Sequence, residues 1–397
     1  MKQQQPNVSL NTRLRPLYVA AFFQSFVLWY AAEKLFMRSI GFSDADIGFM
    51  VAVYSAVMLL IDMPSGLLAD RWSRKGVLIL ASFALAGAAF VGGVSNGIGL
   101  YLLCAILWGV FYACYAGMYE SIVYDTLAEE KQSPALYRKI YGRIQIADSA
   151  GLVLGGLVST FVATRLGLRE TYFLSIPFAL LAVTALLLFR EPQLHKHRRQ
   201  LLGAQVRETF RVVTRRGYAL PVVISLVIKT TVLFMMFEFA QLWLITLNAP
   251  TGFFGFAGAL LYAAIGFGGW FAQHLHIASR KRMVLFVVCL VVSLCGLVFV
   301  KQLFIVVLLQ FVVIGTLVAL AIALTSVLHD LLPSHIRASA VSATSTFGRA
   351  LIIPLALLFG YVSEQSSVFS ATYILLVLSM FMSLFVFTIR RKHVGSE

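Results

Sequence analysis

The sequence predicts an all-α membrane protein of twelve transmembrane helices in two six-helix bundles. Three observations lead to this fold class. Of the 397 residues, 60% are apolar and 12% are charged, and the charged share is about half that of an ordinary soluble domain. The apolar residues form runs close to the roughly 20 residues that a helix needs to cross a bilayer. A long basic segment divides these runs into six and six. Soluble enzymes are therefore excluded.

The first run is longer than the apolar core of a signal peptide, and no small-residue cleavage pattern follows it, so we interpret it as the first helix. The sequence lacks the alternating segments of about ten residues that are typical of a transmembrane β-barrel. The predicted domains are an N-terminal bundle (1–190), a cytoplasmic central loop (191–218) and a C-terminal bundle (219–397). The predicted spans, in order, are residues 16–38, 46–69, 76–95, 98–126, 137–164, 171–190, 219–246, 252–276, 282–300, 302–331, 337–362 and 368–390.

The distribution of basic residues predicts the orientation. Most of the 32 Lys and Arg residues fall in the two tails and in the loops on the same side as the tails, whereas Arg38, Arg165, Arg169 and Lys301 fall in the opposite loops. Because cytoplasmic loops carry the excess of positive charge, we expect both termini to be cytoplasmic. The net charge of +15 then indicates topology, and we expect no nucleic-acid partner.

No reactive centre stands out in the sequence. The four cysteines lie inside apolar runs without metal-ligand spacing. No glycine-rich phosphate loop and no nucleophile–base pattern is present. We therefore expect neither an enzyme, nor a metal site, nor a cofactor.

The two halves resemble each other at a shift of 205 residues. Parallel repeats of six helices are typical of secondary transporters, whose substrate site lies near the bilayer midplane between the repeats. The matching pairs are Pro16 with Pro221, Trp29 with Phe234, Glu33 with Glu238, and Asp125 with Asp330; Gly142-Arg143 matches Gly348-Arg349 with one residue more.

Ionisable residues inside the predicted spans are functional candidates because charge is costly in a bilayer. Glu33, Glu120 and Glu238 are the predicted proton-coupling residues. Lys34 and Lys229 offer counter-charges or contacts for an anionic substrate. The alternative is permanent Glu–Lys pairing that only holds helices together.

Aromatic residues supply the second part of a predicted substrate site. Aromatic faces beside carboxylates suit an amphipathic or cationic organic ligand. On a continuous helix, three tyrosines of the span 98–126 share an arc of about 60°, and Glu120 lies about 80° from the first of them. Ordinary helix packing is the alternative for all of these aromatic residues. The predicted lining residues are Trp29, Tyr30, Lys34, Tyr112, Tyr115, Tyr119, Lys229 and Phe234.

The loop after the second span carries a specific motif. It reads Gly66-Leu-Leu-Ala-Asp70-Arg71-Trp-Ser-Arg74-Lys75. This resembles the G-x-x-x-D-R-x-x-R-K signature of the major facilitator superfamily, at the position that this family requires. With twelve spans and a central loop, the resemblance covers the whole chain. It implies two pseudo-symmetric bundles and transport by alternating access.

The resemblance also implies a cytoplasmic gate. In the family this loop pairs with the other half and with an acidic residue at the end of the fourth helix. The position of Asp125 fits that acidic residue, and Arg143 is a candidate partner. We also expect Gly66 to allow a close approach of helices. The alternative is that these residues only fix topology and packing. The predicted gate residues are Gly66, Asp70, Arg71, Arg74, Lys75, Asp125 and Arg143.

The fifth span favours efflux among the family's functions. Its Ala147-x-x-x-Gly151-Leu152-x-x-Gly155-Gly156 resembles the fifth-helix motif of drug/proton antiporters. It departs from that motif at Ala147, where the motif has Gly, and at Leu152, where the motif has Pro. The fourth span also lacks the intramembrane Arg of many proton antiporters, with Ala105 and Trp108 in that region.

The predicted function is proton-coupled efflux of a small amphipathic compound by a multi-pass, monomeric protein of the bacterial inner membrane. One alternative is uptake of a sugar, peptide or organic anion by proton symport or facilitated diffusion. Another is a transporter-shaped receptor or a lipid-handling protein.

Overall fold

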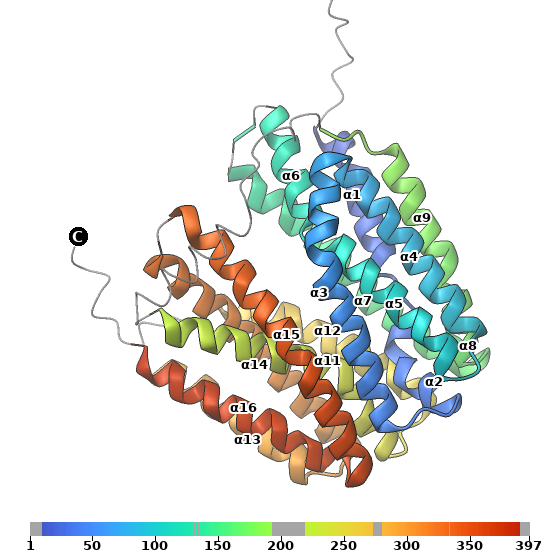
Figure 1. The fold of residues 1–397 in the computed structure, drawn as a ribbon, viewed down its shortest axis with the longest axis vertical. Helices are drawn as coiled ribbons and strands as arrows, with labels where there is room; N and C mark the ends of the chain where they lie inside the picture. The colour runs from blue at the N-terminus through green and yellow to red at the C-terminus, as the bar shows by residue number, and fades with distance from the viewer. Residues whose placement is uncertain are drawn as a thin grey trace, which may run out of the picture. The chain divides into compact units, whose positions relative to one another are not determined.

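The structure, a computed structural model, describes residues 10–130, 132–133, 135–192, 219–272, 280–332 and 334–389. The central loop beyond Pro192 and both terminal tails lie outside these ranges. Within them the chain forms helices and no strand. The elements in chain order are α1 (Leu10–Ser25), the 3₁₀ helix η1 (Trp29–Ala32), α2 (Glu33–Ser39), α3 (Asp44–Arg71), α4 (Arg74–Val94), α5 (Ile98–Tyr115), α6 (Met118–Glu129), α7 (Ala135–Arg165), α8 (Leu168–Phe173), α9 (Ser175–Leu188), α11 (Leu220–Thr246), α12 (Thr251–Ala272), α13 (Arg280–Phe299), α14 (Leu303–Leu331), α15 (Ser334–Gln365) and α16 (Val368–Thr388) (Figure 1).

The helices match the predicted membrane spans. Within the described residues, 10 helices are long and apolar enough to cross a membrane, and Val284–Phe299 forms a shorter apolar helix. The first predicted span, 16–38, is divided among α1, η1 and α2. The all-α membrane class is therefore confirmed, with an interruption in the first span that the sequence did not predict.

The chain forms two compact units. Unit 1 contains Met1–Phe36 and Val57–Arg198, and unit 2 contains Met37–Ala56 and Arg199–Glu397. In unit 1, α4 packs against α5 and α9, and α1 packs against α7 and α9 (Figure 1). In unit 2, α11 packs against α14, α15 and α16. Helix α3 contributes its first residues to unit 2 and the remainder to unit 1.

The beginning of α3 is held in unit 2 by a close helix crossing. A Cβ built on Gly48 would lie 2.5 Å from the backbone oxygen of Ala356 and 3.0 Å from the Cα of Gly360. Such backbone contact requires residues without a side chain. The Asp44 carboxylate accepts a hydrogen bond of 2.6 Å from the Ser363 hydroxyl. These contacts explain why residues 44–56 belong to unit 2.

Three predicted spans of unit 1 are interrupted: the sixth has a one-residue break at Leu174 between α8 and α9, and the first and fourth have longer breaks. Helix α1 ends at Ser25, and residues 26–28 are not helical. This break leaves the amide of Leu28 without a helical acceptor, and the amide donates instead to the Ser175 hydroxyl at 3.0 Å. Between α5 and α6, Gly117 has φ of 72°, a left-handed conformation that glycine adopts without strain. The predicted span 98–126 is therefore two helices whose side chains do not share one continuous register.

Candidate functional site

The start of α4 positions the central cation of the predicted gate. Ser73 caps the helix, and its side chain accepts the amide of Gly76 at 2.7 Å. This cap places Arg74 in the first turn. The Arg74 guanidinium donates to the Asp125 carboxylate at 2.5 Å, to the backbone oxygen of Ser121 at 3.0 Å and to Asp70 at 3.4 Å. The structure therefore joins Asp70, Arg74 and Asp125 as the motif predicts.

The other two basic residues of the motif, Lys75 and Arg71, lie outside the Arg74 network. The ammonium of Lys75 donates to the backbone oxygens of Leu187 at 2.9 Å and Phe189 at 2.8 Å. It thus binds the C-terminal carbonyls of α9, where a cation is favoured. Arg71 is exposed at the end of α3.

The structure does not bring two of the predicted gate residues, Arg143 and Gly66, into contact with the Arg74 network. Arg143 is exposed and makes no ion pair with any described residue, so it does not join the Arg74 network. Gly66 does not mark a close helix approach, because a Cβ there would have no described atom within 4 Å. The sequence indicates that Arg143 lies at the same end of its span as Asp125. It does not indicate which face of α7 carries the Arg143 side chain.

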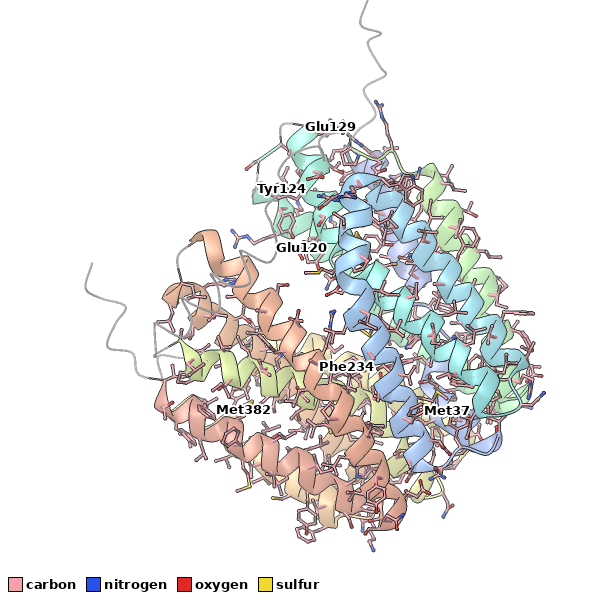
Figure 2. All side chains as sticks on the ribbon, in the orientation of Figure 1. Met37, Glu120, Tyr124, Glu129, Phe234 and Met382 are labelled. Atoms are coloured by element: carbon pink, nitrogen blue, oxygen red, sulfur yellow. The ribbon has the colours of Figure 1, made fainter. Side chains whose placement is uncertain are left out.

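A cavity of about 660 Å³ lies beside this network. It is lined by Arg74, Glu120, Ser121, Tyr124, Asp125, Leu127, Ala128, Gln132 and Tyr137. Figure 2 shows Glu120, Tyr124 and Glu129 along α6. Glu120 is exposed and receives a hydrogen bond from Tyr137. The turn at Gly117 separates Glu120 from the register of α5, so it faces this cavity instead of an apolar helix contact.

The last part of the first predicted span, at the start of α2, holds a buried ion pair. The Lys34 ammonium donates to Glu33 at 2.5 Å, and both side chains are below 10% exposed. The Tyr101 hydroxyl donates to the other Glu33 oxygen at 3.1 Å and lies 2.7 Å from the Tyr172 hydroxyl. Lys34 is therefore the counter-charge of Glu33, its neighbour in the sequence.

A chain of aromatic contacts runs between these two regions within unit 1, and we call it the aromatic ladder. Trp29 contacts Trp108 with ring centroids 4.7 Å apart. Further contacts of 4.9–5.5 Å continue along α5 to its end and across to α6. Trp29 is fully buried, whereas Tyr30, Tyr112 and Tyr115 are partly exposed. The ladder consists of Trp29, Tyr30, Trp108, Phe111, Tyr112, Tyr115 and Tyr119.

The ladder ends at a carboxylate that is absent from our predicted set. Asp148 Oδ1 accepts hydrogen bonds from the hydroxyls of Ser25 and Tyr115, the latter at 2.5 Å. The neighbouring Tyr119 hydroxyl donates to Gln24 at 2.5 Å, and Gln24 donates to Ser82 at 2.7 Å. The sequence signal was an acidic residue in an apolar run. Asp148 lies about 18 Å along the helix from Leu136 and about 26 Å from Arg165, well inside α7.

The predicted residues of unit 2 all lie on α11. Glu238 is buried, and Phe234 (Figure 2) has its ring centroid 5.8 Å from that of Tyr54. Lys229 is partly buried and makes no hydrogen bond or ion pair with a described residue. Nine residues separate Lys229 from Glu238, about 14 Å along the helix, so these two side chains are too far apart to form an ion pair.

No arrangement for a metal ion occurs in the part of the chain that the structure describes, where no group of three or more His, Cys, Asp or Glu residues could hold one. The candidate residues of unit 1 described above gather in two regions. One is the Arg74 network with its cavity, and the other is the aromatic ladder between Glu33 and Asp148.

The family model described as Major Facilitator Superfamily matches residues 16–356. The chain belongs to this superfamily. The chain is 23% identical over 198 residues to "Multidrug resistance protein 1" of Bacillus subtilis, a match that covers 50% of this chain and 49% of the relative. It is 21% identical over 160 residues to "Quinolone resistance protein NorA" of Staphylococcus aureus, with 40% of each chain covered. The matched part thus spans about half the length of these curated relatives or less.

Solved structures share the fold over nearly the whole chain. The bacterial homologue of the lysosomal transporter Spinster has a TM-score of 0.77 at 14% identity, covering 96% of this chain and 98% of that chain. The nucleoside transporter NupG has a TM-score of 0.75 at 18% identity, with the same coverage. The D-xylose–proton symporter has a TM-score of 0.74 at 15% identity, covering 97% and 98%. At these identities the likeness establishes the fold and leaves the substrate open.

Proposed function

We propose that this protein exports amphipathic organic cations in exchange for protons, by alternating access. The observation that carries the proposal is the aromatic ladder. At one end Trp29 stacks on Tyr172, which is joined through Tyr101 to Glu33, and at the other end Tyr115 donates to Asp148. Aromatic faces attract organic cations, and a carboxylate supplies the opposite charge. The multidrug and quinolone resistance proteins among the relatives support the same direction of transport.

The remaining predicted residues take roles in this proposal. The partly exposed Tyr30, Tyr112 and Tyr115 line the route of the substrate in unit 1, and Phe234 does so in unit 2. Glu238, Glu33 and Glu120 are candidates for proton coupling, because ionisable groups inside a membrane mark proton pathways. Charge-assisted hydrogen bonds of Arg74 to Asp125 and Asp70 hold the cytoplasmic ends of α3, α4 and α6 together until the gate opens.

A second candidate is proton-linked uptake of a nutrient that carries an anionic group. It is favoured by Lys229, a partly buried cation of α11 without an ion pair among the described residues. An anionic substrate would supply the missing negative charge. Loss of uptake in Lys229→Met, with unchanged resistance to cationic dyes, would support this candidate.

We further propose that the protein is a monomer of the bacterial inner membrane with both termini in the cytoplasm. In this orientation its two halves, residues 1–190 and 219–397, flank a cytoplasmic central loop. The excess of basic residues in the tails and in the loops on the same side supports this orientation.

Ethidium accumulation in expressing cells tests the proposal. We expect lower accumulation with the wild type than with empty vector, and we expect a protonophore to abolish the difference. Glu238→Gln tests the coupling role of Glu238 and should raise accumulation toward the vector level. Equal accumulation in wild-type and vector cells across several cationic dyes would contradict export, and radiolabelled nutrients would then test the second candidate.

A further inference from the structure

Asp148 lies where two interrupted spans meet the middle of a continuous helix. Ser25 is the last residue of α1, and Tyr115 is the last residue of α5. Both hydroxyls donate to Oδ1 of Asp148 on α7. Irregular backbone at membrane depth is tolerated where it lines a cavity or a binding site. The carboxylate therefore lies beside two breaks in the helical backbone of unit 1.

The two oxygens of Asp148 have different surroundings. Oδ1 holds both hydroxyl groups, whereas Oδ2 makes no hydrogen bond with any described residue, and no described cation lies within ion-pair distance of it. The side chain is partly exposed. Glu33 differs in this respect, since Lys34 already neutralises it. An uncompensated carboxylate in a membrane helix is costly unless it acquires a proton or a cation.

Among the described residues of unit 1, the groups that interact with Asp148 supply no permanent positive charge. Those that interact with it electrostatically are Tyr115 on α5, Tyr119 on α6 and Tyr141 on α7 itself. Several charged residues on the neighbouring elements have partners elsewhere: Arg13 of α1 pairs with Glu129 and Glu130, Glu120 and Asp125 of α6 bond to Tyr137 and Arg74, and Arg169 of α8 bonds to Gly93 and Asn96. Arg15 of α1 is exposed, and Glu170 of α8 carries no positive charge.

The helix that carries Asp148 is fixed against the interrupted span. A Cβ on Gly151 would lie 2.3 Å from the backbone oxygen of Phe22, and a Cβ on Gly155 would lie 3.2 Å from the amide of Val27. These contacts begin one turn after Asp148. A change in the charge of Asp148 therefore acts on the end of α1 through Ser25 and through this close backbone contact.

The geometry points to Asp148 as the residue at which a proton and the organic cation compete, with Oδ2 as the shared acceptor. When Oδ2 carries a proton, the carboxyl is neutral and offers the cation no charge. When the cation approaches from the ladder, past Tyr115, the proton leaves and the negative charge stays on the carboxylate. Each cation bound thus displaces one proton. This inference rests on the proposed function and assigns its exchange step to a residue outside the set predicted from the sequence.

Proton release on binding tests the inference. Tetraphenylphosphonium is added to the purified full-length protein in weakly buffered detergent solution, and protons are counted with a pH indicator while binding is measured by calorimetry. We expect the wild type to release close to one proton per bound cation at a pH where Asp148 is protonated. Asp148→Asn should release none and should bind the cation more than about tenfold more weakly, as for the loss of one charge-assisted contact.

Two further variants keep the test decisive if Asp148→Asn folds poorly. Tyr115→Phe keeps the carboxyl and removes one donor to its charged form, so the pH midpoint of cation binding should rise by roughly one unit. Asp62→Asn, which removes a partly buried carboxylate of α3 in the same unit, should behave as the wild type.

The outcomes separate the inference from the proposed function. If the wild type binds tetraphenylphosphonium and releases protons but Asp148→Asn releases as many, or Tyr115→Phe leaves the pH midpoint unmoved, the inference is wrong and the proposed function stands. If the wild type neither binds the cation nor releases protons, both are wrong.

Discussion

The close contact between α7 and α1 predicts opposite effects for the same substitution at two glycines of one helix. In Gly151→Ala, the new Cβ would meet the Phe22 oxygen at 2.3 Å. This is more than 1 Å short of an ordinary contact of about 3.5 Å, and the obstacle is helix backbone that cannot rotate away. We expect a cost of about 1–3 kcal/mol from overpacking. In Gly142→Ala, no described atom lies within 4 Å of the new Cβ, and helix propensity favours alanine by up to about 1 kcal/mol.

Thermal unfolding of the purified variants measures this difference. A loss of 1–3 kcal/mol corresponds to a fall of roughly 2–10 °C in apparent melting temperature for a cooperative unit of this size. Gly142→Ala should melt at or above the wild-type temperature. Displacement of α1 by the larger residue should also separate Ser25 from Asp148, so Gly151→Ala should transport more slowly even below its melting range. Equal melting temperatures and equal transport for the two variants would refute the packing argument.

Three other substitutions have defined outcomes. Asp125→Asn removes the charged partner of Arg74 and should increase maleimide labelling of a cysteine at Ser121; unchanged labelling and transport would show that the network is not a gate. Lys34→Met leaves Glu33 without its buried cation and should cost about 3–5 kcal/mol, measured by thermal unfolding, with most of it restored by adding Glu33→Gln; a double variant as unstable as the single one would contradict pairing. Gly117→Ala forces a side chain onto φ of 72° and should lose about 1–2 kcal/mol, whereas Gly99→Ala in the same span, with open space around it, should not; equal losses would mean that the turn at Gly117 is not needed.

The fold could be predicted from the sequence because the bilayer sets the length of each helix. Twelve apolar runs and one specific loop motif were enough to assign the spans, and the pairing of Asp125 with Arg74 followed from the position of the motif. The membership of residues 37–56 in unit 2 could not be predicted. It depends on the contacts of Gly48 and Asp44 with residues more than 300 positions away in the chain.

The candidate site was predicted less completely because helix interruptions are hard to read from an apolar run. A continuous helix over 98–126 would keep Glu120 in register with Tyr112, but the turn at Gly117 separates them. Asp148 was visible in the sequence as a charged residue in an apolar span. Its significance depends on Ser25 and Tyr115, which only the fold brings to it.

The central claim is that cation export is driven by proton exchange. Substrate-induced loss of a pH gradient in proteoliposomes tests it most directly. With an acidic lumen monitored by a pH-sensitive dye, adding ethidium should dissipate the gradient in wild-type vesicles, and Asp148→Asn vesicles should behave like protein-free ones. A pH gradient that ethidium leaves intact in wild-type vesicles, while the same protein binds ethidium, would contradict the account.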